Sequence, residues 1–466
     1  MEKPRFSIGW AIGGFLVILM LAIALVLNFN YNAENNNTTD AIDIDNGDTK
    51  IDWDSYPSYN VELSGTYNIT APGTYYISGA IEDGGIFIKL NDNGVARLIL
   101  QDVSIKNSSG PAIACYSGED LVIRLEGSNY LEDGASYDSS FDEDMKGAIY
   151  SKADLTFNGT GTLTLTANHQ DGIVSKDDLK INGGSYNITA SDDGIRGKDS
   201  VYIVDGDIKI SARGDGIKST NEKDLRKNFV LISGGKIEIL KSSEGIEARR
   251  VIIDNGEVSI YANDDGINAN GNTSTTSRSG MMDTNENAAI IINGGNTYVN
   301  AAGDGLDSNG YIYINGGNTV VDGPTNSGNG ALDAGISIVM NGGTALAVGA
   351  SGMAESLGQN SAIYNVSIFF DSTLAKGTLV EIKNSADNTI ISHTSAKTFS
   401  HMAVGSPQFT VGETYIIYIN GIKYDQFTIS EIVTTVGNGG YNIPGGVPNS
   451  TGGEAPQNGA PPGRRL

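Results

Sequence analysis

Most of the chain alternates hydrophobic and polar residues in short runs. A typical unit has a first apolar run such as "VYI", a glycine turn, and a second run such as "IKIS" in which every second residue is apolar. An Asp-Gly corner and an aliphatic residue then begin a third, brief segment. A period of two with many β-branched residues is typical of strands, and the repeat carries no helical stripe. The pattern therefore predicts three short β-strands in each unit.

These units recur about every 22 residues once two polar insertions are removed. The aliphatic residues that follow the corner mark the copies, the last three less clearly: Ile173, Ile195, Ile217, Ile246, Ile267, Leu306, Ile113, Ile149 and Leu332. A unit this short cannot bury its own apolar face, so successive units must stack. We therefore predict an all-β solenoid, a right-handed parallel β-helix, because parallel crossovers are right-handed. A β-propeller is the alternative, but its blades need about 40 residues.

Stacking would bring the acidic corners into one column. The position two residues before the marker aliphatic is acidic in six copies: Asp171, Asp193, Asp215, Glu244, Asp265 and Asp304. Neighbouring strands lie about 4.8 Å apart, and like charges at that spacing repel by roughly 1 to 3 kcal/mol per pair. Carboxylates are hard oxygen ligands that suit Ca²⁺. The doublets Asp192-Asp193 and Asp264-Asp265 are the strongest candidates, whereas the alternative is that each aspartate only caps its own turn.

The N-terminus predicts the compartment. Residues Ile8 to Leu27 are uncharged and about long enough to cross a bilayer, and Lys3 and Arg5 precede them. We predict a cytoplasmic stub with a transmembrane anchor at 1–28 and a polar linker at 29–58, with cleavage as a signal peptide as the alternative. The protein would then be a single-pass cell-membrane protein whose bulk is extracellular. The net charge of -25 makes nucleic acid an improbable partner, because it would be repelled.

The remaining boundaries follow from the repeat. It predicts a parallel β-helix over 59–358. The different strand pattern of 359–437 predicts a β cap or a small β domain, because the open end of a solenoid needs covering. The Gly-, Pro- and Asn-rich tail at 438–466 is typical of disorder. The sequence leaves the oligomeric state undetermined.

The phrases "DGIVSKDDLKINGG", "DDGIRGKDSVYI" and "GDGIKSTNE", which begin at Asp171, Asp192 and Gly214, resemble the carbohydrate-binding domain family of exported bacterial and archaeal proteins. The resemblance implies a right-handed parallel β-helix similar to calcium-dependent pectate lyases, and binding of plant-type or acidic polysaccharides. It also implies Ca²⁺ held by the corner aspartates, here Asp171, Asp192, Asp193, Asp215, Asp264, Asp265 and Asp304. The acidic loop 137–147 is expected to be solvated, although its acids could hold a further cation: Asp138, Asp142, Glu143 and Asp144.

Two other functions stay open. Lyases of this fold remove the proton α to a uronate carboxylate with a Lys or Arg base, while Ca²⁺ acidifies that proton. The candidate bases here are Lys176, Lys198, Lys218 and Arg196. In a protein that does not catalyse cleavage, these cations would offset the acidic column or bind a substrate carboxylate. The leading hypothesis is non-catalytic polysaccharide binding. The remaining possibility is a structural adhesin.

Overall fold

The computed structural model describes residues 52–91, 93–271 and 284–439. They form an all-β structure of long parallel sheets, together with a one-turn 3-10 helix at Trp53–Ser55. These ranges contain no helix with the length and hydrophobicity that a bilayer crossing requires. The predicted anchor, most of the predicted linker and nearly all of the predicted tail lie outside the described residues.

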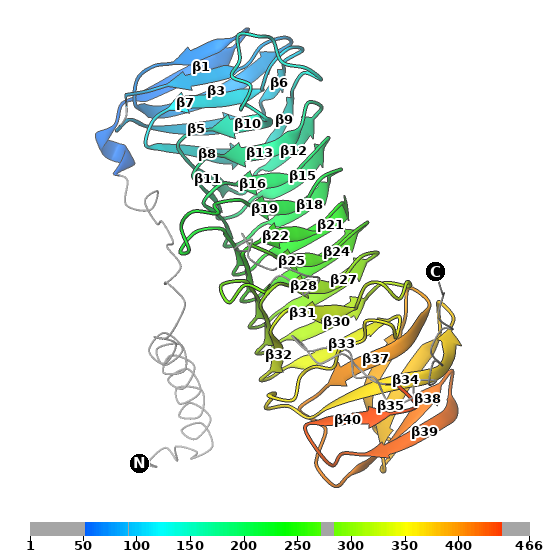
Figure 1. Cartoon of the computed structure of the whole chain (residues 1–466). Coiled ribbons are helices and arrows are strands. Elements are labelled where there is room, and N and C mark those ends of the chain that lie inside the picture. Colours follow the sequence, from blue (N-terminus) through cyan, green and yellow to red (C-terminus); the bar gives the residue numbers. More distant parts are fainter. Residues whose placement is uncertain (1–51, 92, 272–283, 440–466) are drawn as a thin grey trace, which may run out of the picture. The chain divides into compact units, whose positions relative to one another are not determined.

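Three parallel sheets, which we call A, B and C, run along a stack of coils (Figure 1). Sheet A contains β1 (Ser58–Leu63), β3 (Gly73–Ile81), β5 (Val95–Gln101), β8 (Asp120–Glu126), β11 (Asp154–Gly159), β14 (Asp178–Ile181), β17 (Ser200–Ile203), β20 (Phe229–Ile232), β23 (Arg250–Ile253), β26 (Ala289–Ile292), β29 (Tyr311–Ile314) and β32 (Ser337–Met340).

Sheet B contains β2 (Tyr67–Ile69), β4 (Ile86–Lys89), β7 (Ile113–Ser117), β10 (Gly147–Ser151), β13 (Asp171–Ser175), β16 (Ile195–Gly197), β19 (Ile217–Ser219), β22 (Ile246–Ala248), β25 (Ile267–Ala269), β28 (Leu306–Ser308) and β31 (Leu332–Ala334). Sheet C begins with the end of β3 and continues with β6 (Ser104–Lys106), β9 (Ser128–Glu132), β12 (Thr162–Ala167), β15 (Ser185–Ala190), β18 (Asp207–Ser211), β21 (Lys236–Ser242), β24 (Glu257–Ala262), β27 (Asn296–Ala301), β30 (Asn318–Asp322) and β33 (Thr344–Gly349).

Each coil supplies one strand to sheet A, then one to C, then one to B, as β14, β15 and β16 do. The register confirms the alignment made on the sequence. Ile173 pairs with Ile195, Ile195 with Ile217, and the series continues through Ile246. Parallel pairing of every coil with the next is the arrangement of a β-helix and not of a propeller.

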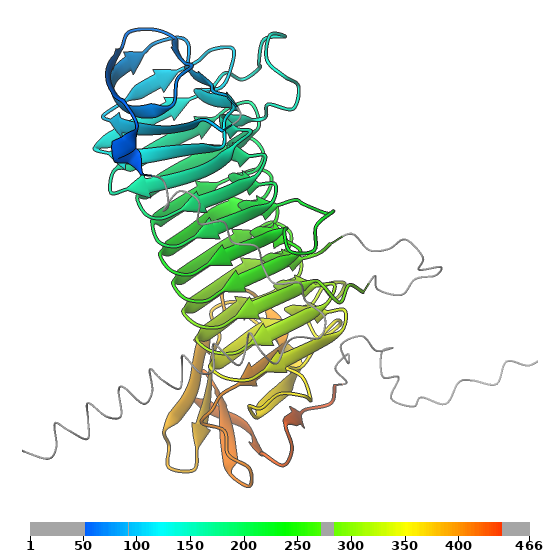
Figure 2. The same cartoon turned by 90° about the vertical axis from the view of Figure 1, so that its left-hand side faces the viewer.

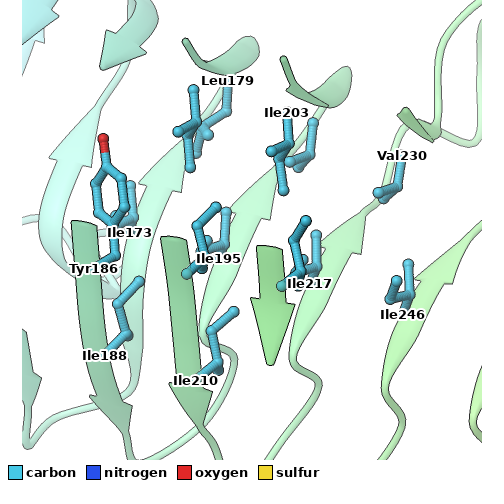
Figure 3. Packing of buried hydrophobic residues seen from close by; sticks show 14 of the residues in the cluster. Ile173, Leu179, Tyr186, Ile188, Ile195, Ile203, Ile210, Ile217, Val230 and Ile246 are labelled. Atoms are coloured by element: carbon cyan, nitrogen blue, oxygen red, sulfur yellow. The ribbon is translucent and has the colours of Figure 1, made fainter. Parts of the chain in front are cut away.

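The three sheets enclose a continuous apolar core (Figure 3). Ile195 of sheet B, Ile203 of sheet A and Ile210 of sheet C belong to one coil, and all three are fully buried. Full burial of such a side chain stabilises the fold by roughly 2 to 3 kcal/mol. Because one residue in two points inward on each strand, the residues between them point outward and carry the chemistry described below.

The last strands cover one end of the stack, coloured yellow to red in Figures 1 and 2. This cap contains β34 (Asn365–Leu374), β35 (Leu379–Asn384), β36 (Thr389–Thr394), β37 (Phe399–Gly405), β38 (Thr414–Ile419), β39 (Ile422–Thr428) and β40 (Val433–Val436). Strand β37 pairs antiparallel with β33, the last strand of sheet C. Leu346 and Val348 of β33 pack into the apolar core of the cap, so the final coil is covered rather than left as an open edge.

Candidate cation-binding face

The outer face of sheet B changes character along the stack. At its first coils the acidic loop folds over the sheet, because Phe141 and Met145 pack against Tyr150 and Val174. Tyr137 donates a hydrogen bond to the buried Asp133 (2.7 Å) and stacks on the His169 ring. The expected solvated loop is therefore anchored by its apolar residues, while its four acidic side chains are exposed.

The acidic column lies at the corner where each coil passes from sheet C to sheet B, as the sequence predicts. One carboxylate oxygen of each aspartate in the column accepts a hydrogen bond from the backbone of the next coil. Asp171 accepts from the Asp193 N–H (3.2 Å), Asp193 from the Asp215 N–H (2.9 Å) and Asp265 from the Asp304 N–H (2.7 Å). The column therefore joins coil to coil, instead of only capping local turns, and leaves the second oxygen of each carboxylate for another partner.

Glycine alternates with the acidic doublets for a steric reason. Gly214 follows the coil of Asp192-Asp193, and a Cβ at Gly214 would lie 2.5 Å from Asp192 Oδ1 and 2.6 Å from Asp193 Oδ1. Gly303 stands in the same relation to Asp264 and Asp265, at 2.6 and 2.4 Å. Only glycine leaves room for two carboxylates from the preceding coil.

Two groups of three carboxylates form on the coils of β13 to β22, with ligand oxygens within 4.8 Å of one another: Asp171, Asp192 and Asp193, then Asp215, Glu244 and Glu247. Both contain a basic side chain. Arg196 Nη2 lies 2.5 Å from Asp171 Oδ2, and Lys218 Nζ donates to Asp215 Oδ2 (2.7 Å) and to Glu247. These internal cations occupy oxygens that a metal ion would need.

A third group lies further along the stack: Asp265 and Asp304 at the corners before β25 and β28, and Asp307 on β28 (Figure 1). Within the described residues, no lysine, arginine or histidine forms an ion pair with these three carboxylates. Asp333 pairs in register with Asp307, and Glu355, which is almost fully buried, accepts the Ala334 N–H (3.2 Å). Five acidic side chains thus gather on the last coils, and none of them forms an ion pair with a basic residue in the part of the chain that the structure describes.

The electrostatics of the third group agree with that geometry. Burial, together with Asp304 and Asp333, raises the pKa of Asp307 to about 8. Burial, Asp265 and Asp333 raise the pKa of Asp304 to about 7. Burial and Asp333 raise the pKa of Glu355 to about 9. The surroundings therefore disfavour the charged form of these carboxyl groups at neutral pH. A bound divalent cation would stabilise that charged form.

The donor set fits Ca²⁺, because it consists of carboxylate oxygens drawn from several coils. The earlier groups also contain an oxygen that needs a partner. Glu244 Oε2 is buried without a hydrogen bond, and burial with Glu247 and Asp215 raises the pKa of Glu244 to about 8. The third group nevertheless fits best, since Lys218 already offsets part of the charge of the second group and Arg196 part of that of the first.

Asp264 was predicted as a ligand together with Asp265, but it is exposed and lies outside the three-carboxylate groups. Asp307 takes the third place instead. It directly follows the inward-pointing Leu306, so a period of two already places Asp307 on the outer face. The alternation of the sequence therefore contains the signal for Asp307, whereas the Asp-Gly corner alone does not.

Another group, Asp154, Asp177 and Asp178, was not predicted and lies at the corner between sheets B and A. Burial and the neighbouring Asp199 raise the pKa of Asp177 to about 6. Lys227 lies 3.7 Å from Asp177 Oδ1 and also pairs with Asp199. This group therefore has an internal cation, like the first two groups on the outer face of sheet B.

The four candidate bases lie in different settings. Arg196 and Lys218 share a column on the outer face of sheet B, as predicted. Burial opposes the charge of Lys218, but its bonds to Asp215 and Glu247 outweigh burial and raise its pKa. A general base must lose its proton near the working pH, so this environment opposes that role. Lys198 is exposed and pairs with Asp199 (3.4 Å), and Lys176 is half-buried beyond β13.

The raised pKa values predict a pH dependence for protein kept free of divalent cations. A carboxyl whose pKa is higher in the folded state stabilises the fold below its unfolded pKa, near 4, and this stability is lost as pH rises through the folded pKa. For Asp304 and Asp307 that window extends to about 7 and about 8. We expect the melting temperature in EDTA to fall between pH 5 and 8, and calcium to remove most of that fall. A melting temperature in EDTA that rises over this range would contradict the assignment.

Comparison with known proteins defines the class. The model of the family described as carbohydrate-binding domain-containing protein matches residues 64–327. A protein of the same description from Acetivibrio thermocellus is 43% identical over 197 residues, which are 41% of this chain and 69% of that protein. The chain therefore belongs to the family of carbohydrate-binding domain-containing proteins.

A solved structure is also similar. It is described as the polysaccharide lyase-like protein from C. thermocellum in a gadolinium derivative, and it has 33% sequence identity and a TM-score of 0.42. The similarity covers 44% of this chain and 90% of that structure.

Proposed function

We propose that this protein binds polysaccharides at the cell surface in a calcium-dependent manner, without cleaving them, through a β-helix with right-handed coils. Membership of the carbohydrate-binding family supports polysaccharide as the ligand. The observation that carries the calcium part is the group Asp265, Asp304 and Asp307, which lacks an internal cation among the described residues. The apolar segment 8–27 supports membrane attachment.

An acidic polysaccharide fits this face best. When bound, Ca²⁺ would accept oxygen atoms from both the protein carboxylates and a uronate group of the polymer. Asp265, Asp304 and Asp307 would hold the ion, while Asp333 and Glu355 would add negative charge around it. Arg196 lies on the same outer face and is about one-fifth exposed, so it can donate hydrogen bonds to a uronate carboxylate further along the polymer.

The test uses polygalacturonate with the full-length chain in a mild detergent. We expect affinity electrophoresis to show retardation in calcium and its loss in EDTA. In the same mixture, absorbance of unsaturated uronide should stay at the level of a protein-free control. Growth of that absorbance would favour the lyase alternative, and retardation that EDTA does not change would contradict the role of calcium.

A further inference from the structure

A second surface lies on the outer face of sheet C, beside the cap. It is a cleft of about 520 Å³ whose floor is formed by β21, β24, β27 and β30. His393 and Thr394 at the end of β36, followed by Ala396, line its wall on the cap side. The outer face of sheet B contributes none of the lining residues, so this cleft is separate from the carboxylate groups.

The floor is a ladder of equivalent positions. In the first column Lys236, Glu257, Asn296 and Asn318 pair strand by strand. In the second column Glu238, Ser259, Tyr298 and Val320 do the same. Because coils repeat about every 4.8 Å, the first column offers a polar side chain at each interval along the stack, and its last two positions are both asparagine. A polymer of similar units lying along the stack matches that spacing better than a single compact ligand does.

The floor is polar, and its charged residues are mostly acidic: Lys236 stands against Glu238, Glu257 and Asp322. The amides of Asn296 and Asn318 are exposed and offer both donors and acceptors. Glu238 is neutralised by two lysines, Lys236 (3.4 Å) and Lys209 (3.3 Å). Asp322 is buried and already accepts bonds from the Tyr298 hydroxyl (2.9 Å), His393 and Ser395. An acidic polymer gains little here, whereas hydroxyl groups can bond to the free amides.

The cleft also holds a fixed aromatic side chain. The hydroxyl bond to Asp322 fixes the half-buried ring of Tyr298, and Tyr261 lies edge-on to it at 5.8 Å between ring centroids. Tyr261 is 46% exposed. A rigid tyrosine beside exposed amides suits a sugar ring, which has an apolar face and polar edges.

The wall of the cleft is held by hydrogen bonds and strand pairing. It comes from the cap, which lies beyond the family match at 64–327. Lys397, next to the wall, donates to the carbonyl oxygens of Ala301 and Gly323, and pairing of β33 with β37 fixes the cap to the last coil. The cleft is therefore complete only where solenoid and cap meet.

We infer that this cleft binds a neutral glycan chain independently of calcium. The inference rests on the proposed function insofar as the ligand is a polysaccharide, but it assigns another face and another sugar class. The protein would thereby bind two kinds of polymer, an acidic one through sheet B and a neutral one through sheet C. The two activities are separable, since no residue is shared between the two sites.

The experiment is affinity electrophoresis of the full-length chain in gels that contain hydroxyethylcellulose, with EDTA throughout. We expect the wild type to be retarded. Tyr298→Ala should weaken retardation about tenfold, as truncation of a central aromatic contact typically does. Ser259→Trp, which fills the floor, should abolish it. Because Tyr298 also bonds to Asp322, the exposed pair Asn296→Ala and Asn318→Ala provides a third variant that leaves the buried contacts intact.

The matched control is Tyr311→Ala, which removes a tyrosine from the outer face of sheet A. It should retain full binding. Unchanged retardation of Ser259→Trp or of the asparagine pair would overturn the inference. The inference would also be overturned if the neutral polymer did not retard the wild type. The same holds if Asp307→Asn were the only variant to lose this retardation. Calcium-dependent binding of polygalacturonate is scored in separate gels, so failure of the cleft and failure of the proposed function give different results.

Discussion

Replacing Asp307 with asparagine is expected to raise the melting temperature of the calcium-free protein and to abolish the further rise that calcium produces in the wild type. Asp307 is surrounded by Asp304 and Asp333, and its pKa is raised to about 8 by burial and by those two neighbours. Removing one charge relieves roughly 1 to 3 kcal/mol of repulsion. The same change removes a ligand, so two effects of opposite sign come from one substitution.

The magnitudes are measurable by thermal melting at pH 8 in EDTA and in excess calcium. A site filled to about 100 times its dissociation constant adds about 2.7 kcal/mol. For a chain of this length that corresponds to a rise of about 3 °C. The wild type should show this rise, whereas Asp307→Asn should begin about 1 to 3 °C higher in EDTA and respond little to calcium.

Asp205→Asn is the matched control, because Asp205 is an exposed acid at a turn and accepts the Gly206 N–H. Its melting temperature should follow the wild type in both conditions. If Asp307→Asn melts below the wild type in EDTA and keeps the full calcium response, the third group does not bind the ion. Asp171→Asn would then test the first group, which Arg196 partly neutralises.

The sequence predicted the stacking well because stacking follows from local rules. The marker aliphatics from Ile149 to Leu332 pair in the expected register. The glycine turn, the period of two and an Asp-Gly corner recur in most units, so one correct alignment fixes the others. The acidic column came with it, since equivalent corners of stacked coils must lie above one another.

The site could not be completed in the same way, because its chemistry depends on neighbours from other coils. Whether a carboxylate is available depends on whether Arg196 or Lys218 lies opposite, and each acts across the gap between coils. Glu355 arrives from a segment after the last parallel strand. The anchoring of the acidic loop could not be predicted either. Phe141 and Met145 of the loop pack against Tyr150 and Val174, and only the structure shows that these two side chains face outward.

The position of Arg249 also could not be predicted from the repeat alone. It falls in the column of Lys176 and Lys198, which favours a role beside the acidic corner. In the structure its side chain is fully buried and turns into the polar insertion between β19 and β20. Its guanidinium donates to the carbonyl oxygens of Asp224 (2.9 Å), Asn221 (3.0 Å) and Lys227 (3.3 Å). The residue therefore holds the insertion loop and does not face a ligand.

Arg249→Met is accordingly expected to lower the free energy of unfolding by about 2 to 4 kcal/mol, because loop carbonyls lose their donor and burial cannot replace it. Trypsin should then cut within the loop, at Lys223, Arg226 and Lys227, under conditions in which the wild type is resistant. Denaturant midpoints and intact-mass analysis measure the two effects. The control is Arg213→Met, an exposed arginine at a corner, which should change neither.

The insertion loop also connects Arg249 to one of the acidic groups. The Arg249→Met variant therefore tests calcium binding as well as stability. Lys227 pairs with Asp199 and lies 3.7 Å from Asp177. Releasing the loop would remove Lys227 from the group Asp154, Asp177 and Asp178 and leave this group with more uncompensated negative charge. The variant should then gain a calcium-induced rise in melting temperature beyond that of the wild type. Equal rises in both proteins would mean that removing Lys227 from this cluster of carboxylates is not sufficient for an ion to bind.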